Sequence, residues 1–267
     1  ANCMNLQINS KNFLITGSSR GIGKSIAQAF LDEGANVGLV ARSQSDLKET
    51  SESLYINSES KISHWTADLT DKKSVQKLFI NADCVFFTGG DQLRLTSIIG
   101  GTAVHDLILE KYYNDPFLYV GTSAGAACAS RNMIYQGSSK EALLKGEIKI
   151  TGGLGLMSDV AIDTHFVKRG RIGRLFQAVV SNPKIIGLGL GEDTGLLICN
   201  GDEMEALGSG LVILVDGRSI KDTNITDISL GEPISIENLI VHVMSMGDSY
   251  VLSSNTFKIR KKENELS

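Results

Sequence analysis

A serine flanked by glycines is the first group in this sequence that could do chemistry. Gly121-Thr122-Ser123-Ala124-Gly125 fits G-x-S-x-G and follows the apolar stretch Phe117–Val120. In such an elbow the chain turns sharply from a strand into a helix, so the neighbours must be small and backbone N–H groups favour negative charge at the hydroxyl. The pattern predicts Ser123 as a nucleophile for carbonyl groups, followed by a helix from Ala124 to about Arg131. The alternative is an ordinary glycine-serine turn after a buried strand.

A nucleophilic serine needs a base, and the sequence offers four histidines. His64 belongs to the N-terminal segment, His105 starts a helix where capping or packing is favoured, and His242 lies in an apolar run that favours a core position. His165 differs because an apolar strand leads into it and three arginines follow it. We therefore expect His165 to be the base.

The third member of the site should orient the imidazole and stabilise its charged form. Glu192 follows the predicted strand Ile185–Leu190, and Asp193 is the nearest competitor. The resulting chain order Ser–His–Glu differs from the Ser–Asp–His order of α/β-hydrolases, which argues against that superfamily.

Composition restricts the classes of function. The chain has 267 residues, 42% of them apolar, and a net charge of −4, which argues against a general binder of nucleic acids or membrane surfaces. None of the cysteines forms a C-x-x-C pair, so we expect free thiols in a reducing compartment. With no charged-then-apolar leader and no apolar run near ~18 residues, the expected location is the cytoplasm. The four cysteines are Cys3, Cys84, Cys128 and Cys199.

The first half alternates strand and helix patterns, which predicts an α/β fold with a mostly parallel sheet covered on both faces. The predicted strands are Asn12–Thr16, Asn36–Ala41, a strand ending near Thr66, Cys84–Thr88 and Phe117–Val120. The predicted helices are Gly21–Glu33, Gln44–Leu54, Lys72–Phe79 and Val104–Tyr113. Later strands are short and separated by Gly, Asp and Asn turns, which indicates antiparallel hairpins. These strands are Ile185–Leu190, Gly195–Cys199, Glu203–Leu207 and Leu211–Val215.

From about residue 80 to Asp216, and on toward the C-terminus, the chain resembles cyanophycinases, serine peptidases related in fold to peptidase E and class I glutamine amidotransferases. The matching stretches are Phe86–Gln92, Gly121–Ala126, His165–Arg174 and Glu192–Thr194. The resemblance implies a flavodoxin-like three-layer sandwich, with Ser123 as nucleophile, His165 as base and Glu192 as its partner. It also implies oxyanion donors at Gly89, Gly90 and Ala124. The implied substrate pocket is lined by Gln92, Asp163, Thr164, Arg169, Arg171 and Arg174.

The implied substrate is cyanophycin, a polyaspartate backbone whose side chains carry arginine, cut to β-Asp-Arg dipeptides through an acyl-enzyme. Arginine forks suit its carboxylates, and Asp163 or a nearby acid suits its guanidinium groups. The alternative for the arginines is a solvated turn with surface ion pairs. Thr164 stands where the family usually has glutamine and lacks the amide donors, so the substrate preference is expected to differ.

The resemblance also implies no metal and no organic cofactor, and a homodimer as the expected assembly. A peptidase E-like aspartyl dipeptidase is the neighbouring alternative for its activity.

The N-terminal segment, residues 8–78, resembles a different family. Thr16–Gly23 matches the T-G-x-x-x-G-I-G turn of short-chain dehydrogenases. That resemblance implies an NADP site in which glycines let a pyrophosphate approach a helix N-terminus. The residues concerned are Gly17, Arg20, Gly21, Gly23, Arg42 and Asp68. No Tyr-x-x-x-Lys pair is found, so hydride transfer is not expected.

The sequence thus predicts a Rossmann-like segment, 1–78, and a peptidase-like region, 79–267, either separate or merged in one sheet. Three explanations stay open: a natural or engineered chimera, a gene-assembly accident that folds poorly, and a chain that retains nucleotide binding. An NADP-binding protein without hydrolase activity is therefore the second functional hypothesis, and the first is the peptidase.

Overall fold

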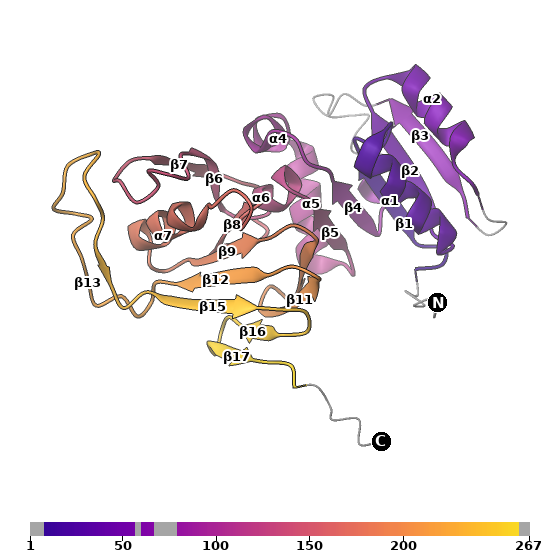
Figure 1. Ribbon diagram of the computed structural model, residues 1–267. Helices are drawn as coiled ribbons and strands as arrows, with labels where there is room; N and C mark the ends of the chain where they lie inside the picture. The colour runs from indigo at the N-terminus through magenta and orange to yellow at the C-terminus, as the bar shows by residue number, and fades with distance from the viewer. Residues whose placement is uncertain (1–7, 57–59, 67–78, 262–267) are drawn as a thin grey trace. The chain divides into compact units, whose positions relative to one another are not determined.

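The alternating strands of the first half form a single parallel sheet. A computed structural model describes residues 8–56, 60–66 and 79–261, and the chain divides into two compact units, Ala1–Cys128 and Ala129–Ser267. In the first unit the strand order is β3-β2-β1-β4-β5, with every pair parallel (Figure 1). The strands are β1 (Asn12–Thr16), β2 (Asn36–Ala41), β3 (Ile62–Thr66), β4 (Cys84–Phe87) and β5 (Leu118–Gly121).

The two segments that resemble different families share this sheet. β1 pairs directly with β4 in the register Phe13↔Cys84 and Ile15↔Phe86. The order reverses between β1 and β4, which in doubly wound folds places a crevice at the carboxyl ends of the strands. The turns after β1, β4 and β5 all leave this same edge because the strands are parallel.

The helices of the first unit lie close to the predicted ranges, except for α4, which was not predicted. They are α1 (Gly21–Asp32), α2 (Gln44–Ser53), α4 (Gln92–Ile99), α5 (Ala103–Asn114) and α6 (Ala124–Cys128). The predicted helix Lys72–Phe79 lies outside the described residues except for Phe79. The prediction that the last helix reaches Arg131 was wrong. The N–H of Arg131 donates to Met157 O at 2.8 Å, which draws the chain into extended pairing instead.

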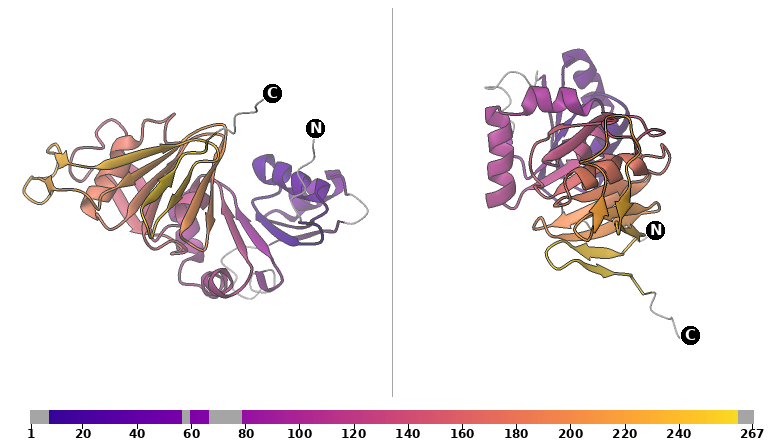
Figure 2. Two further views of the ribbon diagram at one scale, coloured as in Figure 1. Left: turned by 90° about the horizontal axis from the view of Figure 1, so that it is seen from below. Right: turned by 90° about the vertical axis from the view of Figure 1, so that its left-hand side faces the viewer.

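One face of the sheet carries a buried apolar cluster. Apolar side chains at alternate positions, such as Ile15, Val37 and Leu39, pack against Leu31 of α1 and Leu47 of α2. Both helices lie on this face (Figure 2). Burial of one apolar set per strand fixes the register, since a slip by one residue would expose it.

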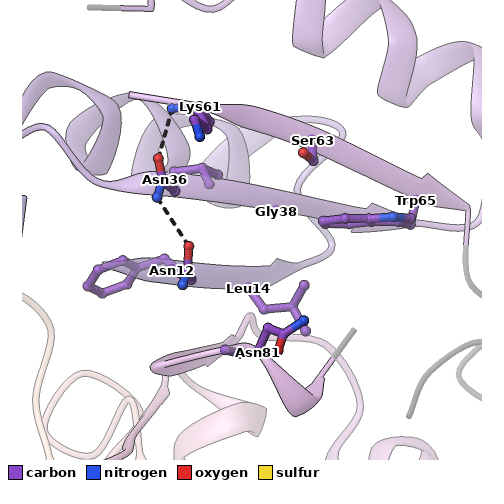
Figure 3. A pocket seen from close by; sticks show the side chains of 11 residues that line it. Asn12, Leu14, Asn36, Gly38, Lys61, Ser63, Trp65 and Asn81 are labelled. Atoms are coloured by element: carbon purple, nitrogen blue, oxygen red, sulfur yellow. Dashed lines mark hydrogen bonds between the residues drawn. The ribbon is translucent and has the colours of Figure 1, made fainter. Parts of the chain in front are cut away.

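The opposite face of β1–β3 carries a hollow of about 260 Å³ (Figure 3). Trp65 lies against Gly38, where an added Cβ would stand 2.6 Å from the indole ring. Asn36 links the polar end by accepting from the N–H of Lys61 at 3.0 Å and donating to Asn12 Oδ1 at 3.1 Å. None of the predicted site residues lines this hollow.

The second unit is mainly antiparallel, as the hairpin pattern predicts. One sheet has the order β15-β12-β9-β8, in which only β8 and β9 are parallel, and another has the order β10-β11-β16-β17. Their strands are β8 (Val160–Thr164), β9 (Ile186–Leu190), β12 (Val212–Asp216), β15 (Ile240–Met244), β10 (Thr194–Cys199), β11 (Glu203–Gly208), β16 (Ser249–Val251) and β17 (Thr256–Lys258). Two further hairpins are β6 (Asn132–Gly137) with β7 (Ile148–Gly152), and β13 (Asp222–Thr223) with β14 (Ile236–Glu237).

In the second unit, helix α7 (Ile172–Ser181) packs against strands β7, β8, β9 and β12. Its apolar stripe, Leu175, Ala178 and Val179, is fully buried. Gln177 on the same helix is also buried and donates from Nε2 to Ala142 O at 2.9 Å and Leu144 O at 2.6 Å. α7 thereby anchors the loop between β6 and β7 as well as the sheet.

Candidate active site

Ser123 lies in a strained turn between β5 and α6. Its φ of 52° is in the left-handed region, which non-glycine residues rarely adopt. An added Cβ at Gly121 would collide with the backbone of Gly125, and one at Gly125 would collide with Phe87 O. The glycines of the motif are therefore required by close packing. This geometry matches the nucleophile elbow that the sequence predicts.

The glycine turn after β4 borders the nucleophile within the first unit. A Cβ at Gly89 would stand 3.2 Å from Ser123 Cβ and 3.6 Å from its Oγ. The next residue, Gly90, has φ of 148° and open space around it. The structure thus brings Gly89 close to Ser123, with Ala124 next to Ser123 in the chain. Backbone N–H groups of this turn and of Ala124 are the groups that an oxyanion would use.

Tyr119 supports the elbow and was not predicted. Its Oη donates to Gly125 O at 2.6 Å, and its ring stacks on Phe87 at 5.4 Å between centroids. Burial raises the pKa of Tyr119 well above its ordinary value, so the phenol keeps the proton that it donates. The sequence signal was an aromatic residue on the strand four positions before the serine, which ordinary strand propensity explains equally well.

His165 and Glu192 form the other part of the predicted site, within the second unit. His165 follows β8, and Glu192 lies in the turn after β9, the parallel neighbour of β8. His165 Nδ1 and Glu192 Oε1 are 3.1 Å apart. The hydrogen bond from His165 lowers the pKa of Glu192, so the carboxylate stays ionised and Nδ1 carries the proton. Nε2 is then the ring nitrogen for proton transfer.

The predicted substrate pocket splits into a buried and an exposed part. Asp163 is 3% exposed and pairs with Arg171 Nη1 and Arg174 Nε, each at 3.1 Å. Burial raises the pKa of Asp163, and both arginines oppose that effect. Arg169 is exposed, and Thr164 is half-buried.

The remaining histidines differ in their surroundings, and the prediction that His242 is a core residue was wrong. His105 Nδ1 accepts from the N–H of Gly101 at 3.2 Å, near the start of α5. His242 stacks on Phe257 with centroids 4.9 Å apart, and it is half-buried rather than a core residue. His64 is exposed on β3. Gln92, in the first unit, begins α4, which Asp91 caps by accepting from the N–H of Arg94.

The glycine turn after β1 contains two glycines in the left-handed region. Gly17 and Gly21 have φ of 63° and 56°, and a Cβ at Gly23 would lie 2.6 Å from Gly17 O. Arg20 and Arg42 are exposed. Asp68 lies outside the described residues.

The described part of the chain offers neither a cluster of metal ligands nor a membrane-spanning helix. Residues 8–56, 60–66 and 79–261 hold no group of three or more His, Cys, Asp or Glu arranged to bind a metal ion. Over the same ranges, no helix has both the length and the apolar character needed to cross a membrane.

A serine in a glycine-packed elbow, a bordering glycine turn and a histidine held by a carboxylate are the groups that a serine hydrolase uses. Residues 38–206 match peptidase family S51. This chain belongs to peptidase family S51. The match begins within the segment that resembles short-chain dehydrogenases.

Individual relatives match different parts of the chain. A cyanophycinase from Trichormus variabilis is 37% identical over 172 residues, which is 64% of this chain and 58% of the relative. This chain therefore spans less than two thirds of the length of that curated relative. A 3-dehydrosphinganine reductase from Arabidopsis thaliana is 36% identical over 72 residues, 27% of this chain and 22% of the relative.

One solved structure shares the fold. The crystal structure of a peptidase from an acI-B1 Actinobacterium has a TM-score of 0.53 at 17% identity and covers 91% of this chain and 97% of that chain. At this identity the likeness speaks for the fold alone.

Proposed function

We propose that this chain is a serine peptidase that hydrolyses cyanophycin to β-Asp-Arg dipeptides. The observation that carries the proposal is the contact of 3.1 Å between His165 Nδ1 and Glu192 Oε1, in a chain whose Ser123 occupies a strained elbow. The substrate follows from the similarity to cyanophycinases. The assignment to the flavodoxin-like, class I glutamine amidotransferase-like sandwich belongs to the same proposal.

In the proposed mechanism Ser123 Oγ attacks a backbone carbonyl of the polymer and passes its proton to His165 Nε2. Glu192 stabilises the imidazolium that results. The N–H groups of the Gly89-Gly90 turn and of Ala124 receive the oxyanion. The imidazolium protonates the leaving amine, and water then attacks the acyl-enzyme with His165 as base, which releases the dipeptide and restores Ser123. No metal or organic cofactor takes part.

Arg169 is the exposed arginine of the predicted pocket, so we assign it to a carboxylate of the substrate. Gln92 and Thr164 are further substrate contacts in this proposal. Because threonine cannot supply amide donors, Thr164→Gln is expected to lower KM for cyanophycin. A homodimer is part of the proposal, and size-exclusion chromatography with light scattering tests it.

The direct test is incubation of the purified chain with insoluble cyanophycin and detection of soluble β-Asp-Arg by mass spectrometry. The wild type should release dipeptide, and Ser123→Ala should lose at least roughly 10³-fold in rate. Release of aspartyl products from short peptides but not from the polymer would favour a peptidase E-like dipeptidase. Unchanged hydrolysis by Ser123→Ala would refute the assignment.

A second candidate function, NADP binding, is favoured by the left-handed φ at Gly17 and Gly21 and by the exposed Arg20 and Arg42. The turn leaves room for a pyrophosphate, because nothing lies within 4 Å of a Cβ added to Gly21. NADPH fluorescence should rise on binding, and Gly21→Val should abolish the rise. No enhancement with the wild type would dismiss this candidate.

A further inference from the structure

Three charged side chains converge at a point where the chain enters His165. Asp163, the fourth residue of β8, is 3% exposed, and the side chains of Arg171 and Arg174 are 16% and 5% exposed. Arg171 Nη1 donates to Asp163 Oδ1 at 3.1 Å. Arg174 Nε lies 3.1 Å from Oδ2 at ion-pair distance but without hydrogen-bond alignment. A buried carboxylate without such cations would be costly, so the cluster depends on both arginines.

The same cluster forms hydrogen bonds with both the N–H and the C=O of Thr164. The N–H of Thr164 donates to Asp163 Oδ1 at 3.0 Å, and Arg171 Nη1 donates to Thr164 O at 2.7 Å. One guanidinium nitrogen therefore bridges a buried carboxylate and the carbonyl of the peptide bond that leads into His165. A lysine would offer a single ammonium in place of the planar fork.

His165 needs such support because its backbone is strained. Its φ is 54°, a left-handed conformation that is unfavourable for a non-glycine residue and persists only where the surroundings fix it. On the far side of His165, the N–H of Phe166 donates to Leu190 O at 3.1 Å. The Phe166 ring is fully buried against Gly189, where no Cβ could fit. The backbone is thus fixed on both sides of His165, by the hydrogen bonds of Thr164 and by those and the packing of Phe166.

We propose that Asp163 and Arg171 are positioning residues that set the backbone of His165, and through it the direction of the imidazole, while Arg174 neutralises Asp163. This inference rests on the proposed function, and it assigns to Asp163, Arg171 and Arg174 a task inside the protein instead of direct contact with substrate. Arg169, exposed on the same segment, keeps the substrate role.

The test compares kcat and KM for soluble β-Asp-Arg release in Arg171→Lys and Arg169→Lys. Arg171→Lys should lower kcat about 10–100-fold with KM within about twofold, since a small misplacement of a catalytic group costs about that much. Arg169→Lys should mainly raise KM. A rise in KM at constant kcat in Arg171→Lys would overturn the inference.

A matched control excludes general destabilisation. Arg218 pairs with the buried Asp216 at 2.8 Å elsewhere in the second unit. Arg218→Lys should lower the melting temperature as Arg171→Lys does and leave kcat and KM within about twofold. Equal losses of kcat in both variants would show that loss of a buried ion pair, and not positioning, explains the result.

A double-mutant cycle keeps the inference testable if stability changes. In a His165→Ala background, Arg171→Lys should have no further effect on the residual rate, because the residue that it positions is gone. Independent, multiplicative losses would contradict the inference. Asp163→Asn should behave like Arg171→Lys in the same cycle. If the wild type itself releases no dipeptide, the proposed function has failed, and that outcome is distinct from the loss patterns above.

Discussion

Glu192 serves His165 through its charge as well as its position. The hydrogen bond from His165 lowers the pKa of Glu192, so this carboxylate remains ionised as the pH falls through the mildly acidic range. A neutral amide at this position would keep the size of the side chain but could not stabilise an imidazolium. Its NH2 group could also donate to Nδ1, which favours the wrong tautomer, with the proton on Nε2.

Glu192→Gln is therefore expected to lower kcat by about 10²–10⁴-fold with little change in the melting temperature. Initial rates of dipeptide release at saturating substrate measure the effect. Asp193→Asn is the matched control, because Asp193 is the neighbouring carboxylate, and it should stay within about threefold of the wild type. Equal losses in the two variants would remove Glu192 from the proposed triad.

Gly89 approaches Ser123 so closely that a methyl group there would enter the space beside the nucleophile. Its Cβ would stand 3.2 Å from Ser123 Cβ. Gly89→Ala should therefore reduce kcat at least about tenfold, since displacement of a reacting group is costly even when it is small. Gly152→Ala is the control, because nothing lies within 4 Å of a Cβ there and its φ is unexceptional. Similar kinetics of both variants would argue against an oxyanion role for this turn.

The three proposed catalytic residues were predictable because each stands at the end of a recognisable strand: Ser123 after β5, His165 after β8 and Glu192 after β9. Tyr119 and the pair Phe166–Gly189 were not, since their roles depend on contacts between strands that no local pattern reveals. The roles of the arginines could not be predicted either, because they depend on burial. Arg174 is buried and Arg169 is exposed, although they lie only five positions apart.

At the scale of elements, the strands and long helices of the first half followed from hydrophobic periodicity. α7 was missed because Arg169, Arg171 and Arg174 were interpreted as a binding turn, although Leu175, Ala178 and Val179 follow a helical spacing. α6 ended early because Arg131 pairs with Met157. For α6 a tertiary contact outweighed the local pattern, whereas the spacing in α7 already favoured a helix.

The turn before β16 shows how one carboxylate holds an element. Asp248 accepts from the backbone N–H groups of Ser245 and Arg260, each at 2.8 Å. These hydrogen bonds lower the pKa of Asp248 below its ordinary value of 3.8. Since the folded-state pKa is the lower one, its stabilisation is present above that ordinary value and is lost as the pH falls through the folded-state pKa.

Asp248→Asn should therefore be less stable than the wild type at pH 7, and the difference should shrink as the pH falls below about 4. Urea unfolding at a series of pH values measures it. Asp227→Asn, at an exposed aspartate, serves as the control and should show a flat difference. A difference for Asp248→Asn that stays constant with pH would contradict this account.

At the scale of the whole molecule, a segment that resembles dehydrogenases supplies three strands of a sheet that also holds Ser123, the proposed nucleophile. β1 lies in the middle of that sheet and pairs with both β2 and β4. Among the described residues, Cys84, Cys128 and Cys199 are free thiols.

Deletion of residues 1–78 should leave β4 without its partner β1 and expose the buried side chains of Cys84–Phe87 at a sheet edge. Such an edge favours aggregation, so the shortened chain is expected to be insoluble or to unfold without a cooperative transition. Circular dichroism and light scattering give the answer. A soluble, monomeric fragment that melts like the full chain would show that the N-terminal strands are dispensable.

The central claim is that Ser123, His165 and Glu192 act as one catalytic unit. A fluorophosphonate probe, which transfers its phosphonyl group to an activated serine and releases fluoride, tests it most directly on the full chain. The account predicts one adduct, located by peptide mass spectrometry on Ser123, with a labelling rate at least roughly 10²-fold lower in His165→Ala. Labelling that spares Ser123, or that proceeds equally fast without the His165 imidazole, would contradict it.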